Sequence, residues 1–169
     1  MKTRTRRQWA GLALLAALGA CSQAPRTAHP LEPTDDTVCV LDGMALKDAA
    51  GPKAQIHYGE GQPDFFCDLV ELFDAVRAPE SRRAVAAVFV QDMGKADWDH
   101  PRANWIDAKT AFYVVGSRKH GSMGPTFGAF ANASDADAFA AREGGRVLRF
   151  DQITADMAHK DAAHDDRMH

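Results

Sequence analysis

A pattern of strand, turn, helix and strand occupies residues 54–90, AQIHYGEGQPDFFCDLVELFDAVRAPESRRAVAAVFV. Residues 54–58 predict a strand, and the glycines and polar residues at 59–62 predict a turn. Apolar side chains then recur at helical spacing until Pro79, at Phe66, Leu69, Val70, Phe73 and Val76. The apolar run at 84–90 predicts a buried strand after this helix.

A similar pattern follows in the second half of the chain. Residues 111–115 and 127–130 predict strands on either side of a glycine-rich loop. A capping-box pattern at 134–137 opens a predicted helix, which the glycines at 144–145 close. Residues 147–150 predict the last strand.

With a short apolar run at 38–41, which predicts a further strand, the order strand, strand, helix, strand occurs twice. The sequence therefore predicts an α+β fold made of two ββαβ-type units. These units cover about residues 38–92 and 105–150, within one domain at 38–156. A chain of this length is sufficient for one compact domain or two small halves that share a core.

The N-terminal segment has the pattern of a bacterial lipoprotein signal. Its first residues are positively charged, and the apolar run at 9–20 is too short to span a bilayer of ~30 Å as a helix. Leu18-Gly19-Ala20-Cys21 resembles a lipobox, so we predict a signal peptide at 1–20 and lipidation of Cys21. An ordinary secretory signal with a chance cysteine is the alternative.

The two ends of the predicted domain are polar. Residues 21–37 contain three prolines and predict a lipidated linker that anchors the domain to a membrane, and residues 157–169 predict a disordered tail. The whole chain has a net charge of −3, and loss of four cations with the signal peptide makes it −7. Because nucleic acids and anionic lipid surfaces bind basic patches, this charge argues against nucleic acid as a partner.

The sulfur-containing residues indicate a metal site. Lipidation uses Cys21, which leaves Cys39 and Cys67 either as a disulfide or as reduced thiols that bind metal. Cys39 and Met44 are five residues apart across a glycine turn, and soft sulfur ligands favour copper(I). Zinc is less favoured, because no second pair of ligands lies at zinc-finger spacing.

Further candidate ligands lie in other segments. Met123 is flanked by glycines in a polar loop, where a core role is disfavoured, and His120 beside it is the best candidate for a third donor. Cys67, His57 and Met93 are weaker candidates. His57 is more typical of a strand residue whose ring is hydrogen-bonded to a neighbour than of a ligand. Met93 is more typical of a residue that covers the core at the end of a buried strand.

Several blocks of sequence together resemble the NosL family, the accessory lipoproteins of nitrous oxide reductase. The blocks are the lipobox, CVLDGM at 39–44, GPKAQIH at 51–57, FFC at 65–67, VQDM at 90–93, WIDA at 105–108 and GSMGP at 121–125. The resemblance implies a periplasmic, lipid-anchored copper(I) chaperone for the copper–sulfide centre of nitrous oxide reductase. It also implies an ABC-transporter maturation complex as a partner, and a fold like the organomercurial lyase core.

The resemblance carries over to particular residues. Gly43 and Met44 match a Cys-Gly-Met pattern in which Asp42 replaces the cysteine, so Cys39 is either a substitute or the pattern's own first cysteine. Met123 matches the loop methionine of the family. Cys67 matches a cysteine at a helix start, where the helix dipole is expected to lower its pKa.

No pattern indicates an enzyme. The chain has no nucleophile elbow, P-loop or dinucleotide-binding glycine motif, and the acidic residues near His100 read as a surface loop. Two other functions remain open. One is a thiol redox protein that uses Cys39 and Cys67, and the other is a structural lipoprotein that only docks a partner.

Overall fold

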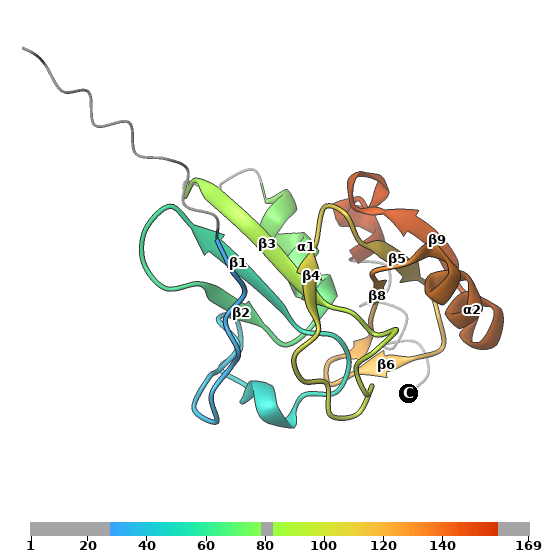
Figure 1. The fold of residues 1–169 in the computed structure, drawn as a ribbon, viewed down its shortest axis with the longest axis horizontal. Helices are drawn as coiled ribbons and strands as arrows, with labels where there is room; N and C mark the ends of the chain where they lie inside the picture. Colours follow the sequence, from blue (N-terminus) through green and yellow to red (C-terminus); the bar gives the residue numbers. More distant parts are fainter. Residues whose placement is uncertain (1–27, 79–82, 159–169) are drawn as a thin grey trace, which may run out of the picture.

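The computed structural model describes residues 28–78 and 83–158 (Figure 1). The predicted signal peptide, Cys21 and residues 159–169 of the predicted tail lie outside the described residues. Among the helices that are described, none combines the length and the hydropathy of a membrane span.

The first half of the chain forms a four-stranded antiparallel sheet in the order β2-β1-β3-β4. Its strands are β1 (Ala54–Tyr58), β2 (Asp64–Phe66), β3 (Val85–Gln91) and β4 (Trp105–Asp107). The helix α1 (Leu69–Arg77) packs against β1 and β2, and a 3-10 turn, η1 (Leu46–Asp48), precedes β1.

The second half forms a three-stranded antiparallel sheet in the order β8-β5-β9. Its elements are β5 (Phe112–Val115), β8 (Gly128–Phe130), α2 (Ala133–Glu143) and β9 (Arg146–Arg149). The helix α2 packs on all three strands. A small hairpin of β6 (His120–Gly121) and β7 (Gly124–Pro125) lies between β5 and β8, and the 3-10 turn η2 (Phe150–Gln152) follows β9.

The predicted α+β class and its two similar units are confirmed. Each unit has a central first strand, β1 or β5, which pairs antiparallel with the second and third strands of its unit. In each unit the helix lies between the second and third strands in sequence. The two sheets lie side by side in Figure 1, with β1–β3 and β5–β9 in separate parts of the molecule.

The first unit differs from the prediction in one respect. Residues 38–41 form only an isolated bridge, between Val38 and Ala45, and the second strand of the unit is instead β2. Phe66 was predicted to begin the helix but ends β2, because Asp68 caps α1 by accepting a hydrogen bond from the Val70 amide at 2.6 Å. A strand of only three residues has too little alternation to be recognised in sequence.

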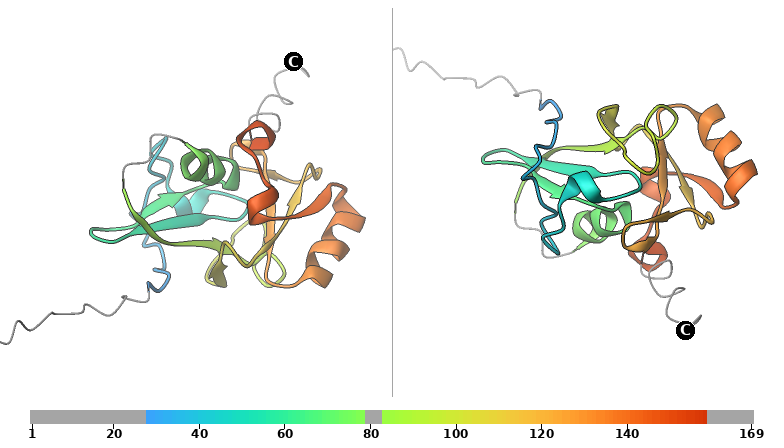
Figure 2. Two further views of the ribbon diagram at one scale, coloured as in Figure 1. Left: turned by 90° about the horizontal axis from the view of Figure 1, so that it is seen from above. Right: turned by 90° about the horizontal axis from the view of Figure 1, so that it is seen from below.

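One hydrophobic core joins the two units. Phe73 on α1 is fully buried and lies edge-on to Tyr113 of β5, with 5.2 Å between ring centroids. Its ring also lies 5.3 Å from that of Phe150 after β9. Arg77 at the end of α1 donates hydrogen bonds to the carbonyls of Phe150 and Ile153. Figure 2 (left) accordingly shows α1 beside the segment that follows β9.

The described part of the predicted linker contacts the first sheet. The Leu31 amide donates to Gln55 Oε1 at 2.8 Å. The Glu32 carboxylate accepts hydrogen bonds from the Ala103 amide at 2.9 Å and from Trp105 Nε1 at 2.8 Å. Residues 31 and 32 are therefore held against β1 and the segment that leads into β4.

Candidate metal centre

Two thiols and two carboxylates meet at the start of α1. One ligand atom from each of Cys39, Asp42, Cys67 and Glu71 lies within 4.8 Å of the other three. We call this group the thiol–carboxylate cluster. Cys39 and Cys67 are buried, whereas Asp42 is exposed and Glu71 is half-buried, so the cluster reaches the surface on its carboxylate side.

The loop at 39–44 is held in a tight turn by its own backbone. The Cys39 amide donates to the Met44 carbonyl at 2.8 Å, and the Gly43 amide donates to the Cys39 carbonyl at 3.0 Å. Gly43 has a φ of 75°, which a residue with a side chain rarely adopts. The Val40 amide also donates to the Phe65 carbonyl at 2.8 Å. This last bond ties the loop to the end of β2 and brings Cys39 to Cys67.

The first turn of α1 supplies the other side of the cluster. Cys67 directly precedes the N-cap residue Asp68, and Glu71 lies four residues after Cys67 in the first turn of the helix. Both thiols donate to the same oxygen, Glu71 Oε2, at 3.1 Å from Cys39 Sγ and 3.4 Å from Cys67 Sγ. Both cysteines are free thiols, so the disulfide alternative is not present in this structure.

The cluster favours protonated thiols in the absence of metal. Burial raises the pKa of Cys39. Burial and then the neighbouring Glu71 carboxylate raise the pKa of Cys67. The expectation that the helix dipole lowers the Cys67 pKa is therefore wrong, because burial and acidic neighbours outweigh the dipole and Asp68 already caps the helix. A bound cation would replace the thiol protons and offset the negative charge.

The methionine and histidine candidates lie at different places around this cluster. Met44 is half-buried and packs against the group formed by Cys39, Leu46, Ala49 and Cys67. Met123 lies between β6 and β7, with 52% of its surface exposed. The ring of His120 is not part of the thiol–carboxylate cluster, and its carbonyl accepts a hydrogen bond from Trp98 Nε1 at 2.8 Å.

The β6–β7 hairpin that carries Met123 is docked beside the cluster. The Ala50 amide donates to Ser122 Oγ at 2.6 Å. Gly121 lies so close to Asp68 that a Cβ atom at this position would be 2.7 Å from Asp68 Oδ2. The hairpin therefore contacts the residue that follows Cys67, and glycine at position 121 permits this approach.

The two weakest candidates lie away from the cluster. His57 Nε2 is 2.7 Å from Gln55 Oε1, and its ring lies edge-on to Phe89. Burial lowers the pKa of His57. Met93 packs against the core of the second unit, as Trp98 does.

Sequence reasoning missed Glu71 and treated Asp42 only as a departure from the family pattern. A signal for Glu71 was present, because side chains four residues apart at a helix start lie on the same face. Asp42 has a structural role as well, since its Oδ1 accepts a hydrogen bond from the Met44 amide at 2.8 Å. The loop therefore places a carboxylate beside the thiols and also orients Met44.

The acidic residues near His100 organise the backbone of their loop. Asp92 is buried and accepts hydrogen bonds from the amides of Gly94 and Ala131, both at 3.0 Å. Asp97 Oδ1 accepts from the amides of Asp99 and His100, at 3.0 and 2.8 Å. These contacts fit the predicted surface loop.

Lys53 is a buried cation near the cluster. Its side chain is 3% exposed, and Nζ donates to the Ala49 carbonyl at 2.6 Å. Burial lowers the Lys53 pKa to about 8, and the positive charge of Arg102 lowers it further, while Cys67 acts in the opposite direction.

We expect Lys53→Met to stabilise the fold at pH 7 and to lose this effect near pH 10.5. The folded-state pKa is about 8 against 10.5 for a free lysine, so the charged form costs on the order of 3 kcal/mol below pH 8. As the pH rises from 8 to 10.5, the unfolded chain still binds this proton while the folded chain does not, so wild-type stability rises. Urea unfolding of both proteins across this range measures the difference. Lys47→Met, at an exposed site, serves as control, and a Lys53→Met difference that does not change with pH would contradict the prediction.

Comparison with known proteins identifies the family of the chain. The NosL family model matches residues 30–158. A relative from Stutzerimonas stutzeri, named copper-binding lipoprotein NosL, is 38% identical over 148 residues, which cover 84% of this chain and 77% of the relative. A protein of the same name from Achromobacter cycloclastes is 39% identical over 151 residues, which cover 86% and 78%.

A solved structure agrees with these sequence matches. The crystal structure of the copper chaperone NosL from Shewanella denitrificans is 34% identical, with a TM-score of 0.70, and the match covers 78% of this chain and 98% of that one. The names of these relatives describe copper binding or a copper chaperone and no catalysed reaction, which agrees with the expectation that the chain is not an enzyme. The chain belongs to the NosL family.

Proposed function

We propose that this protein is a periplasmic, lipid-anchored copper(I) chaperone that supplies copper for the copper–sulfide centre of nitrous oxide reductase. One observation carries the copper site: two reduced thiols, Cys39 and Cys67, share the Glu71 carboxylate inside a single cluster. Relatives named copper-binding lipoprotein NosL support the choice of metal and the lipid anchor. Nitrous oxide reductase and its ABC-transporter complex are the proposed partners.

The donor set favours copper(I) over harder ions. Cys39 and Cys67 would supply two thiolates. Met44 packs against the group that contains both cysteines and would supply a thioether, which is also a soft ligand. Carboxylates are hard ligands, so Asp42 and Glu71 suit a different task. Glu71 Oε2 already accepts both thiol hydrogen bonds and is placed to pass the thiol protons on to solvent as the metal enters. This assignment makes Cys67 a principal ligand.

Met123 and His120 complete the proposal as donors that could approach from the β6–β7 hairpin. The hairpin contacts Asp68 and Ala50 rather than the sulfur atoms themselves. Met123 is exposed, so its thioether is free to take part in capture or release of the metal. Loss of affinity in Met123→Leu, with no change in His120→Ala, would assign the third ligand to the methionine.

The surface around Cys39 suits metal transfer to another protein. Val38, Val40 and Leu41 are about half exposed, at 51%, 48% and 59%, and they flank a cysteine that is 1% exposed. A client that covers these apolar side chains would exclude water from the site. Its sulfur or imidazole could then replace one ligand before the next leaves, and the ion would not be released into water.

The binding test uses the reduced chain from residue 22 onward, which contains every described residue. Anaerobic titration with copper(I) against a chromophoric chelator should give one ion per chain, and X-ray absorption should show sulfur as the main ligand. Binding of less than half an equivalent, or a first shell without sulfur, would remove the proposed site. Transfer is tested separately by mixing the loaded protein with metal-free reductase and its maturation complex. Retention of copper in that assay would reject the delivery step and leave the binding site intact.

A thiol redox protein is the second candidate, because the two sulfur atoms lie within 4.8 Å of each other. Against it, both thiols are buried and have raised pKa values, which disfavour the attacking thiolate. Thiol titration separates the two functions. A redox protein cycles between two reactive thiols and none under mild oxidant and reductant, whereas a chaperone loses thiol reactivity when copper(I) is added.

A further inference from the structure

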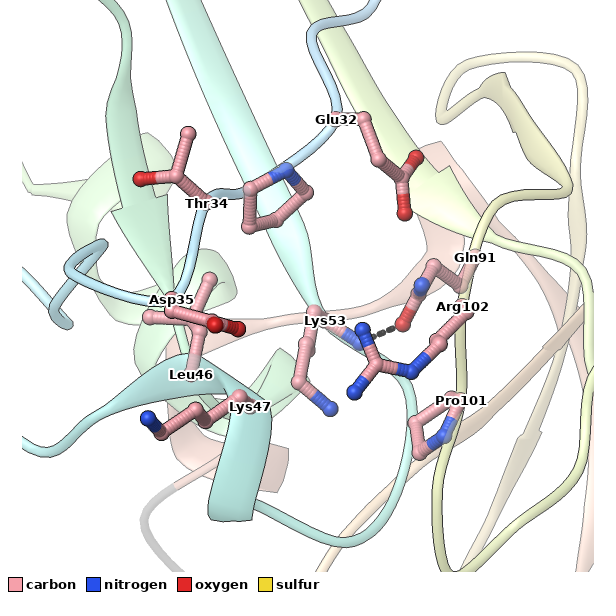
Figure 3. Close-up of a pocket in the computed structure, with 10 residues that line it drawn as sticks. Glu32, Thr34, Asp35, Leu46, Lys47, Lys53, Gln91, Pro101 and Arg102 are labelled. Atoms are coloured by element: carbon pink, nitrogen blue, oxygen red, sulfur yellow. Dashed lines mark hydrogen bonds between the residues drawn. The ribbon is translucent and has the colours of Figure 1, made fainter.

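A second polar site lies where the chain enters β1, and Leu46 and Lys53 are among the residues that line it. It is a pocket with an empty volume of about 340 Å³, part of which is open to solvent. Its lining residues come from the 32–35 segment, η1, the start of β1, the end of β3 and the segment before β4 (Figure 3). Pro33, Leu46 and Pro101 provide apolar walls.

Two cations point into this pocket. The Lys53 ammonium and the Arg102 guanidinium lie near each other in Figure 3. The Arg102 charge lowers the pKa of Lys53, as expected for like charges that face one another, and Lys53 remains mostly charged at pH 7 because its pKa is about 8. Lys53 Nζ uses one of its donors on the Ala49 carbonyl, and no described residue forms an ion pair with either side chain.

The acidic residues of the pocket form no ion pair with these cations within 4.0 Å. Both oxygens of Glu32 are occupied, one by the Ala103 amide and the other by Trp105 Nε1. Asp35 lies on the opposite wall, is exposed, and forms no ion pair within 4.0 Å among the described residues. A lysine that is 3% exposed therefore lies near an arginine, and neither side chain forms an ion pair with a described residue.

We propose that this pocket binds a small oxyanion, a carboxylate or phosphate group, between Lys53 and Arg102. An anion there would relieve the repulsion between the two cations and use donors that have no protein partner. The apolar walls strengthen such an interaction by reducing its exposure to water. The pocket is small and partly open to solvent, which suits a compact ion better than a nucleotide.

The anion site uses other residues than the proposed copper site, although Cys67 lies close enough to affect the pKa of Lys53. It shares no residue with the thiol–carboxylate cluster, and its donors are the nitrogen atoms of Lys53 and Arg102. It can therefore be tested on the reduced, metal-free protein, and failure of either proposal leaves the other standing.

In the experiment, the anion is added stepwise to the metal-free chain at constant ionic strength, and ¹H–¹⁵N NMR spectra monitor binding. Sodium phosphate and sodium acetate are the two probes, and sodium chloride is the reference salt. We expect saturable shifts that are centred on Lys53, Arg102 and the Trp105 indole, whose hydrogen bond to Glu32 borders the pocket. Saturation by phosphate alone assigns a tetrahedral oxyanion, and saturation by acetate alone assigns a carboxylate.

Variants then locate the site. Arg102→Gln removes an exposed cation and should weaken binding of the saturating ion at least ~10-fold, on the scale of a lost charged hydrogen bond. Lys53→Met, which is expected to fold at least as stably at pH 7, should weaken it to a similar degree. Lys109→Gln makes the same charge change as Arg102→Gln at an exposed turn outside the pocket, and it should bind as the wild type does. Shifts that do not saturate with either probe, or equal affinity in Arg102→Gln and Lys109→Gln, would overturn the proposal.

Discussion

Cys39→Ser and Cys67→Ser should each reduce the copper(I) affinity by at least ~100-fold. Loss of a residue that only hydrogen-bonds to a metal ligand usually costs ~10–100-fold, and loss of a ligand should cost more. Each variant removes one of two soft thiolates and leaves a hard hydroxyl in a buried position. The competition titration with a chelator measures the change. Proton release gives a second readout, because both thiols have raised pKa values and are protonated at pH 7. The wild type should release about two protons per copper, and each variant about one.

Matched methionine variants separate a ligand from a packing residue. Met44→Leu removes a thioether from a side chain that packs against the group containing the two cysteines, so it should weaken copper(I) binding by a smaller factor than either serine variant. Met93→Leu makes the same chemical change in the core of the second unit and should leave the affinity unchanged. If both cysteine variants kept wild-type affinity and released two protons, the assignment of the thiol–carboxylate cluster as the copper site would be wrong.

Parts of the fold were readable from sequence because their signals are local. The second unit has a closing glycine pair and apolar runs of sufficient length, and the structure has α2 and β9 at nearly the predicted places. The predicted capping box at 134–137 is not formed, because α2 begins at Ala133 after the N-cap residue Asn132. The segment at 38–41 is different. Its apolar residues resemble a strand, but the loop at 39–44 closes on itself and leaves Val40 and Leu41 exposed. The residues near 38–41 do not indicate that β2, rather than this segment, pairs with β1.

The site was readable to a similar extent. Local spacing connected Cys39 with Met44 across a glycine turn, and this loop indeed holds both residues together. The approach of Cys67 to Cys39 depends on a hydrogen bond between the loop and the end of β2, which is a tertiary contact. The predicted direction of the Cys67 pKa shift was wrong because that shift also depends on tertiary contacts. Burial and the Glu71 carboxylate determine that shift, and neither follows from a helix start alone.

The second large effect is expected at Phe73, which connects the two units and supports the helix that carries Glu71. Phe73→Ala should lower the free energy of unfolding by about 3–5 kcal/mol, as is usual for removal of a buried aromatic ring. The fully buried ring lies 5.2 Å from Tyr113, 5.8 Å from Phe127 and 5.3 Å from Phe150, all of which belong to the second half of the chain. Chemical denaturation followed by circular dichroism and tryptophan fluorescence measures this loss.

The form of the transition tests the shared core. The wild type should unfold in one transition by both probes. In Phe73→Ala the other residues of the shared core still join the units, so the two probes should again report one coincident transition, shifted to lower denaturant. Val85→Ala, at a side chain that is 42% exposed, is the control and should change stability by no more than ~0.5 kcal/mol. At temperatures where Phe73→Ala is fully folded, its copper(I) affinity should stay within about threefold of the wild-type value. Phe73 is not part of the thiol–carboxylate cluster, and a packing change that removes no ligand should shift binding only slightly. Two separate transitions in the wild type would instead show that the units fold independently, and that the ring contacts of Phe73 do not couple them.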